Sequence, residues 1–386
     1  MDSLAWIPGV GHWMSGQKGR AFVVGALFLT YIAIGAANAS AITDTFARSG
    51  RWLGGATIPF AERHADFLVA SLFLFAMLIG LVLFSGLAYR RWKAAQDAPA
   101  GPPQGQWSIV WRQFKKNKLG VAGAAIILAL YMAAFMAPFI ATHDPDVQGH
   151  RVKERLLEPS KEHFLGTDRF ARDFFSRIVY GARISLLVGL LSVAIAVTIG
   201  TVYGAVAGYY SGRWVDGVMM RFVDLMMAFP TLILIITIIA VWRKQSIWII
   251  ITIIGLTSWM GLARLVRGEF LTLKELDWFQ AARGLGATPS RLIFVHLLPN
   301  AMTPIIIAST LRVGAAILTE ASLSFLGLGV QPPTPSWGNM VLDAKGNIFT
   351  EWWLPLSAGL AIVITVVGYN LLGDALRDSL DPRLRR

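Results

Sequence analysis

Long apolar stretches separated by short polar ones run through the whole chain. A membrane-crossing helix needs about 20 mostly apolar residues, and eight segments come close to that length, with Ile247–Ala263 the shortest. The eight segments are Ala21–Thr43, Phe67–Tyr89, Leu119–Ala141, Ser185–Gly208, Val223–Trp242, Ile247–Ala263, Thr303–Leu323 and Leu354–Leu372. The pattern therefore predicts an all-α polytopic membrane protein.

The first apolar segment has a second interpretation. Ala37-Asn38-Ala39-Ser40-Ala41 follows an apolar stretch and is similar to the small-residue cleavage site of a secretory signal peptide. Residues 21–43 are long enough for a spanning helix, so we expect a retained span. The orientation of the remaining spans is the same in either case.

A segment rich in proline, glycine and alanine divides the spans into two groups. Residues 94–106 have the sequence AAQDAPAGPPQGQ, which lacks helical periodicity and has the composition of a flexible linker. We therefore expect an N-terminal two-span unit at 1–93 and a six-span core at 107–386.

The composition excludes the main classes of water-soluble protein. Of the 386 residues, 55% are hydrophobic and 15% are charged, and the mean hydropathy is +0.56. A soluble domain carries about 25% charged residues, so a soluble enzyme, a disordered scaffold and a nucleic-acid binder are all disfavoured. The formal charge of +12 instead indicates topology signals and contacts with membrane lipid. The chain contains no cysteine, which excludes disulfides and thiolate metal sites.

Basic residues near the span ends predict the orientation, because loops rich in Lys and Arg stay in the cytoplasm. The densest cluster flanks the linker and comprises Arg90, Arg91, Lys93, Arg112, Lys115, Lys116 and Lys118. Placing this cluster inside puts both termini in the cytoplasm. The loop Thr142–Arg183, which then lies outside, is also basic and argues in the opposite direction.

The polar loop at 264–302, between the sixth and seventh spans, has the pattern of two short helices joined by a sharp corner. Glycine tolerates the left-handed conformation that ends helices, so the first helix is expected to stop near Gly284 or Gly286. Thr288 suits the N-cap of the second helix. Pro299 disfavours helical geometry in the residue before it, so this helix is expected to end by Leu298.

The side chains of this loop suit docking to a partner. Small residues permit close approach, apolar residues offer contacts and arginines offer charge, as in a short helix that fits a groove. The residues concerned are Ala281, Ala282, Leu285, Leu292, Ile293, Arg283 and Arg291.

The spacing of this loop resembles the EAA loop of importer-type ABC permeases, whose pattern is E-A-A, three residues, G, nine residues and I-x-L-P. Gln280-Ala281-Ala282 is followed at matching spacing by Gly286 and by His296-Leu297-Leu298-Pro299. Gln280 replaces the usual Glu and removes its negative charge. His296 replaces the Ile, similar to the His-x-Leu-Pro-Asn form of peptide-type permeases. The resemblance implies that this loop, with Arg283 and Arg291, contacts a separate ATPase.

Three further motifs resemble the second (C-type) permease of dipeptide and oligopeptide importers. They are Gly166–Asp173 with Ser176-Arg177 and Tyr180–Arg183, then Glu320–Gly329 with Pro332–Asn339, and finally Asn370–Asp374 with Asp381-Pro382-Arg383. Ala171 stands where that family usually has glycine. The alternating Asp and Arg residues of the first motif indicate an ion-paired segment outside the core, and the prolines of the second indicate a rigid outer loop.

Several residues inside the spans are candidates for the transport pathway or for packing. Gly200, Gly204 and Gly208 recur every fourth residue, which favours close helix packing. Charged residues within a span often mark a pathway, although a buried structural role is an equal alternative. The candidate pathway residues are Arg312, Glu320, Met226 and Phe229.

Motifs for catalysis are absent from the sequence, so an enzyme is not indicated. It contains no G-x-x-x-x-G-K-[ST] phosphate loop, no H-E-x-x-H and no G-x-S-x-G. The six histidines are scattered and show no metal-ligand spacing, so no metal or cofactor is expected on this chain.

The resemblance implies a multi-pass permease of the bacterial inner membrane that imports di- or oligopeptides. It also implies four kinds of partner: a second related permease, two ATPase subunits or domains that bind ATP and Mg²⁺, an extracytoplasmic substrate-binding protein, and membrane lipid. Two alternatives remain open. One is the same architecture with nickel, glutathione or another small solute as cargo, and the other is an autonomous ion-coupled transporter that uses Arg312 and Glu320.

Overall fold

The computed structural model describes residues 106–149, 153–242 and 246–380, all of which belong to one unit at Gln106–Arg386. Within these ranges the secondary structure is helical, with one isolated bridge between Thr167 and Asp173 and no strand. The predicted all-α class is confirmed. The predicted two-span unit at 1–93 lies outside the described residues, as does the linker at 94–106 apart from Gln106.

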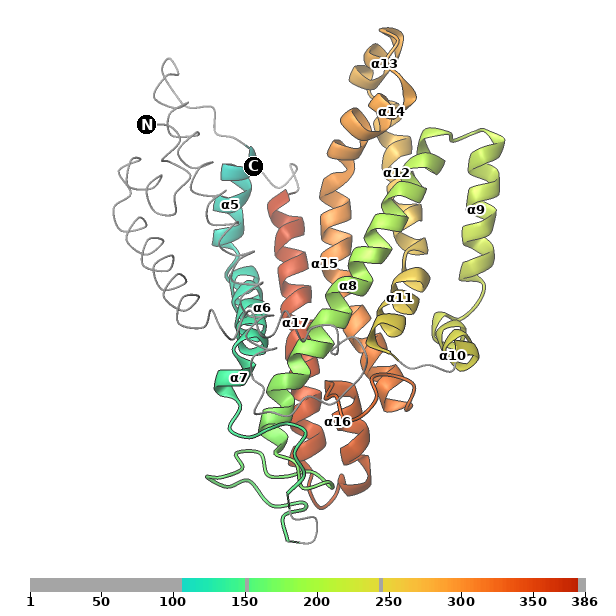
Figure 1. Cartoon of the computed structure of the whole chain (residues 1–386). Helices are drawn as coiled ribbons and strands as arrows, with labels where there is room; N and C mark the ends of the chain where they lie inside the picture. Colours follow the sequence, from blue (N-terminus) through green and yellow to red (C-terminus); the bar gives the residue numbers. More distant parts are fainter. Residues whose placement is uncertain (1–105, 150–152, 243–245, 381–386) are drawn as a thin grey trace, which may run out of the picture. The chain divides into compact units, whose positions relative to one another are not determined.

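The helices bear the labels of Figure 1. They are α5 (Gln106–Lys116), α6 (Lys118–Phe135), α7 (Ala137–Ile140), α8 (Phe174–Tyr209), α9 (Trp214–Met227), α10 (Thr231–Trp242), α11 (Ile247–Ser258), α12 (Met260–Lys274), α13 (Asp277–Gly284), α14 (Pro289–Arg291), a π-helix (Leu292–Leu297), α15 (Leu298–Phe325), α16 (Trp337–Ala344), a 3₁₀ turn (Lys345–Asn347) and α17 (Trp353–Leu380).

Five helical stretches of the described core are long and apolar enough to cross a membrane. They are α6, α8, α11 with α12, α14 through α15, and α17. The pair α9 and α10 also passes the test when its two helices are taken as one span, although they are bent by 83°. The core thus has five spans, or six with the bent pair, in agreement with the predicted number. The short predicted span at Ile247–Ala263 belongs to a longer stretch that reaches Lys274.

The fifth predicted span, Val223–Trp242, is broken in the structure. Helix α9 ends at Met227 and α10 begins at Thr231, with Pro230 between them. Proline lacks a backbone N–H and disfavours helical geometry in the preceding residue, so the ladder of helical hydrogen bonds stops here. The hydropathy of the segment was sufficient for a span, but the proline divides it into two.

The expected helix end at Leu298 is wrong. The chain remains helical from Pro289 to Phe325, and the turn before Pro299 widens into the π-helix Leu292–Leu297. The Leu298 N–H bonds to the Ile293 carbonyl, five residues back. Proline in a helix clashes with the carbonyl four residues before it, and the wider turn gives that carbonyl another position.

Helix α8 is the centre of the core and lies alongside α12 (Figure 1). Gly200, Gly204 and Gly208 face α12 so closely that added Cβ atoms would lie 2.8 Å from the Trp259 carbonyl oxygen, 2.4 Å from that of Ala263 and 2.6 Å from the Phe270 Cβ. The three glycines serve helix packing, which is the interpretation that their spacing favoured.

Opposite ends of these helices carry different features (Figure 1). Helices α13 and α14 project at one end, together with the last residues of α17; this is called the α13 end. Helix α16 and the segment between α7 and α8 lie at the other, called the α16 end. The two sequence motifs that resemble permease signatures outside the membrane therefore gather at the α16 end.

The motif at Gly166–Asp173 forms a buried ion-paired network at the α16 end. The Arg172 guanidinium lies 2.6 Å from Asp168 Oδ2 and 3.1 Å from Asp343 Oδ2. Arg177 lies 3.5 Å from Asp146. Partial burial raises the pKa of Asp146, and the positive charge of Arg177 offsets only part of this increase. The predicted ion pairing is present, and Arg172 and Asp168 are both buried.

Ala171 has a left-handed backbone conformation, with φ of 59°. A Cβ makes this conformation unfavourable, which explains why the resembling family usually has glycine at this position.

Candidate functional site

The polar loop after α12 is anchored to α8 at its start. The Lys274 ammonium donates to the carbonyls of Gly208 and Tyr209 at 3.2 and 2.8 Å, and to Ser211 Oγ at 2.7 Å. It thereby binds the carbonyls of the last turn of α8, where a positive charge is favourable. Gln280 in turn donates from Nε2 to the Lys274 carbonyl at 2.8 Å. A carboxylate could not donate this bond, so Gln280 closes the loop in a way that Glu could not.

Helix α13 ends in a Schellman turn at Gly286. The Gly286 N–H bonds to the Arg283 carbonyl at 3.0 Å and the Ala287 N–H to the Ala282 carbonyl at 3.3 Å. These are the two bonds of that motif, and they require a left-handed residue between them. Gly286 has φ of +80°, and a Cβ added to it would meet nothing within 4 Å. The predicted corner is therefore present, and Gly286 is needed for its backbone conformation alone.

The second helix of the loop starts where the sequence predicted. Thr288 occupies the N-cap position with Pro289 as the first helical residue. The Thr288 side chain lies 3.4 Å from Ser290 Oγ and makes no capping bond to the backbone. The start of this helix therefore depends on the backbone geometry of Thr288 and Pro289.

One face of the loop packs into the chain itself. Phe279 is buried against Leu292, Ile293 and Leu297 in a cluster that includes residues of α12 and α15. Leu292 and Ile293 were expected to offer contacts to a partner, but they are enclosed by their own chain. The loop is consequently a fixed projection with its own small core.

The opposite face of the loop is exposed. Leu285, at the corner, is 89% exposed. Phe294 and Val295 are also exposed. The sequence did not single them out, because consecutive apolar residues at 292–295 show no helical period. Six of the residues predicted for docking are exposed as well: Gln280, Ala281, Arg283, Gly286, Arg291 and Pro299.

Two predicted loop residues are only partly exposed. Ala282 packs against the buried cluster around Phe279. His296 is half-buried in the π-helix, and its carbonyl accepts a hydrogen bond from Asn300 Nδ2 at 2.7 Å. The His296 carbonyl therefore accepts a bond that stabilises the first turn of α15.

Ion pairs connect α12, which carries the loop, to the bent pair of helices. Arg267 donates from Nε and Nη2 to the two carboxylate oxygens of Asp216 on α9, at 2.6 and 2.7 Å. Arg264 pairs with Asp224, also on α9. Bidentate arginine–carboxylate pairs fix both distance and orientation. A displacement of α12 would therefore be passed to α9.

The candidate pathway residues do not form one cluster in this chain. Met226 packs against the small core around Val223 and Trp259, whereas Phe229 is exposed at the break between α9 and α10. Arg312 donates to the Ser258 carbonyl at 2.9 Å, where α11 ends. Arg312 thus satisfies a carbonyl released by the change from α11 to α12.

Glu320 is fully buried and connects three elements at the α16 end. Ser324 Oγ donates to its Oε1 at 2.7 Å, and Ser185 Oγ of α8 lies 3.5 Å from its Oε2. Ser185 also accepts the Trp337 N–H at 3.2 Å, at the first residue of α16. The surroundings of Glu320 indicate a structural junction of α8, α15 and α16.

Two substitutions of Glu320 test whether its side-chain oxygens stabilise this junction as hydrogen-bond acceptors. We expect Glu320→Gln to keep an acceptor for Ser324 and to retain most of the stability. Glu320→Leu leaves buried hydroxyls without an acceptor, at a cost of about 1–3 kcal/mol. Thermal unfolding in detergent measures the difference, and equal transition temperatures for the two variants would contradict the assigned junction.

Two family models match the described core. Residues 200–386 match the binding-protein-dependent transport system inner membrane component, and residues 105–159 match the N-terminal TM domain of oligopeptide transport permease C. The dipeptide transport system permease protein DppC of Alkalihalophilus pseudofirmus is 42% identical over 292 residues, which are 74% of this chain and 94% of that protein. The chain belongs to this family of ABC importer permeases.

Other relatives of this permease carry different substrate names. The glutathione transport system permease protein GsiD of Pectobacterium atrosepticum is 40% identical over 72% of this chain and 92% of its own length. The oligopeptide transport system permease protein OppC of Bacillus subtilis is 40% identical over 72% and 90%. A solved inward-facing MetNI methionine ABC transporter is similar with a TM-score of 0.46 and 20% identity, over 54% of this chain and 97% of that one.

Membership of this family gives the location of the permease and the kind of complex to which it belongs. It is a multi-pass protein of the inner membrane and one component of an ABC transport complex. The loop at α13, which resembles the EAA loop, therefore belongs to a protein that works with other subunits.

Proposed function

We propose that this permease forms half of the translocation pathway of an ATP-driven peptide importer and that the loop at 264–302 docks on a separate ATPase subunit. The partners are a second related permease, two ATPase subunits or domains that bind ATP and Mg²⁺, and an extracytoplasmic binding protein. The observation that carries the proposal is the shape of the loop. It is anchored by Phe279 and Lys274 and projects Leu285 into solvent at the corner.

The exposed face of the loop has the chemistry of a docking helix. A large apolar side chain at its tip, small Ala281 beside it and flanking Arg283 and Arg291 suit an apolar groove with an acidic rim. An ordered loop of this kind loses little conformational entropy on binding. It would therefore pass a movement of the ATPase on to the helices that carry it.

The mechanism follows from the connections of the loop. Closure of the ATPase pair on ATP would displace α13 and, through α12, the arginine pairs of Arg264 and Arg267 with α9. The bent pair α9 and α10 would then change its packing, so that the pathway alternates between outward and inward access as a shift between two packed states. Exposed Phe229 at the bend and Arg312 on α15 would face the moving boundary, whereas Met226 would act through packing.

The orientation proposed here places the α13 end and both termini in the cytoplasm. Helix α5, which carries Arg112, Lys115 and Lys116, lies toward the α13 end, as does the end of α17 (Figure 1). Basic residues at that end agree with the positive-inside rule. The α16 end would then meet the binding protein outside.

Peptides are the proposed cargo because relatives named for dipeptide and oligopeptide transport match most of the core. Glutathione, itself a small peptide, is the second candidate, since a glutathione permease has similar identity. Uptake of labelled dipeptides and labelled glutathione by the reconstituted complex separates the two.

The absence of cysteine from the chain gives a direct test. Leu285→Cys and its matched control Phe349→Cys, which is 96% exposed beyond α16, each introduce one reactive thiol at opposite ends. In intact cells we expect a membrane-impermeant maleimide to label only Cys at position 349. In the assembled complex we expect a short crosslinker to join only position 285 to the ATPase.

Either of two results would overturn the proposal. One is labelling of position 285 from outside the cell. The other is ATP-independent uptake that continues after the ATPase subunits have been deleted, which would favour an autonomous ion-coupled transporter.

A further inference from the structure

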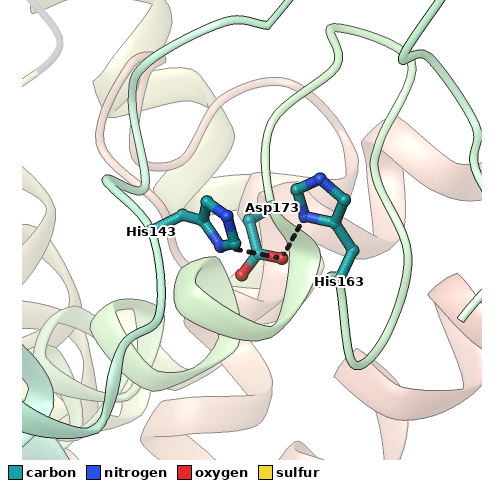
Figure 2. A group of neighbouring side chains, drawn as sticks. All are labelled: His143, His163 and Asp173. Atoms are coloured by element: carbon teal, nitrogen blue, oxygen red, sulfur yellow. Dashed lines mark hydrogen bonds and ion pairs between the residues drawn. The ribbon is translucent and has the colours of Figure 1, made fainter. Parts of the chain in front are cut away.

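Two histidines and an aspartate that are far apart in the sequence meet at the α16 end. His143 follows α7, His163 lies in the segment before α8, and Asp173 is the N-cap of α8. Figure 2 shows the two imidazole rings on either side of the Asp173 carboxylate. One ligand atom from each residue can be chosen so that all three lie within 4.8 Å of one another. The linear spacing of the histidines gave no sign of this cluster.

The distances suit one small cation. Asp173 Oδ1 lies 2.8 Å from His163 Nδ1 and 3.7 Å from His143 Nδ1. Ligand atoms bound to one zinc ion at about 2.0–2.1 Å in tetrahedral geometry are about 3.3 Å apart, and the two observed distances bracket this value.

The backbone around each ligand is already fixed. Asp173 Oδ2 accepts the Ser176 N–H at 2.8 Å as the cap of α8, which leaves Oδ1 directed at the imidazoles. The His143 N–H donates to Ser176 Oγ at 3.0 Å. The His163 N–H donates to Ser160 Oγ at 3.1 Å. Preorganised ligands with a hydrogen-bonded outer layer are typical of metal sites.

The charge distribution distinguishes Asp173 from its neighbours. The buried side chains of Asp168 and Asp343 are paired with Arg172. Asp173 is equally buried, with a side chain 1% exposed, but faces two imidazoles. The His143 side chain is 42% exposed, so a cation could enter from solvent on that side and keep water as a further ligand.

We propose that His143, His163 and Asp173 bind a divalent transition-metal cation of the zinc class. Two imidazole nitrogens with one carboxylate favour Zn²⁺, Ni²⁺ or Co²⁺, whereas Mg²⁺ and Ca²⁺ prefer oxygen ligands alone. The bound cation would join the segment after α7, the segment before α8 and the start of α8. The proposal concerns binding by this chain and does not depend on the transported substrate.

The test uses the full chain, purified without a polyhistidine tag, stripped with chelator and titrated with Zn²⁺. We expect one Zn²⁺ per chain, and absorption bands of bound Co²⁺ when Co²⁺ replaces it. His143→Ala with His163→Ala should weaken Zn²⁺ binding at least about 100-fold, because two of the three protein ligands are removed. Asp173→Asn still caps α8 but should also weaken binding. His296→Ala, at the opposite end, is the matched control and should bind as the unaltered chain does.

Thermal unfolding provides a second readout. Zn²⁺ should raise the transition temperature of the unaltered chain and of His296→Ala, but not that of the double histidine variant, because a ligand stabilises only the form that binds it. The proposal is overturned if the unaltered chain binds no stoichiometric Zn²⁺. It is equally overturned if the double variant binds Zn²⁺ with unchanged affinity.

Discussion

Gly286→Trp removes ATP-driven uptake and substrate-stimulated ATP hydrolysis while the permease still inserts into the membrane. Gly286 has a left-handed backbone with φ of +80°, which costs an L-residue roughly 1–2 kcal/mol. A side chain at this position meets nothing in its own chain, so its bulk would project toward the proposed ATPase. Loss of a central docking contact of about 2 kcal/mol lowers affinity about 30-fold. Uptake and ATP hydrolysis by the reconstituted complex measure the effect.

Gly286→Asn is the matched control. Asparagine tolerates the left-handed conformation and adds less bulk, so the Schellman turn should persist and most of the coupling with it. Both variants should purify from membranes in normal amounts, because the surroundings of Gly286 are open. Full transport by Gly286→Trp in the assembled complex would remove the basis for docking at this corner.

Gly204→Leu prevents the core from folding. A Cβ at this position would lie 2.4 Å from the Ala263 carbonyl oxygen and 2.8 Å from the Val266 Cβ. Backbone cannot move aside as a flexible side chain can, and overpacking alone costs 1–3 kcal/mol in milder cases. We expect a loss of more than about 3 kcal/mol, because α8 must separate from α12 along its length. The yield of monodisperse protein in detergent measures this loss.

Gly359→Leu in α17 is the control for this prediction. A Cβ at Gly359 meets nothing within 4 Å, and its backbone is not left-handed. The same change of glycine to leucine in a spanning helix should therefore leave the yield and the transition temperature nearly unchanged. A similar loss in both variants would show that helical glycine as such, and not contact with α12, determines stability.

The proposed coupling loop illustrates how far local sequence information extends. A left-handed glycine, an N-cap position and a following proline act within a few residues, so the corner at Gly286 and the start at Pro289 could be predicted. The end of the second helix could not. Pro299 is accommodated by a π-turn whose geometry depends on the packing of Leu292 and Leu297 beneath it.

The sequence by itself determined the membrane setting, the approximate number of core spans and the resemblance to importer permeases, because hydropathy and motif spacing are properties of contiguous residues. Tertiary structure alone decided which loop residues face outward, that Glu320 joins α8 to α16, and that His143, His163 and Asp173 meet. These features depend on contacts between residues distant along the chain. Such contacts are fixed only when helices with apolar faces pack together and the segments at their ends are brought to one place.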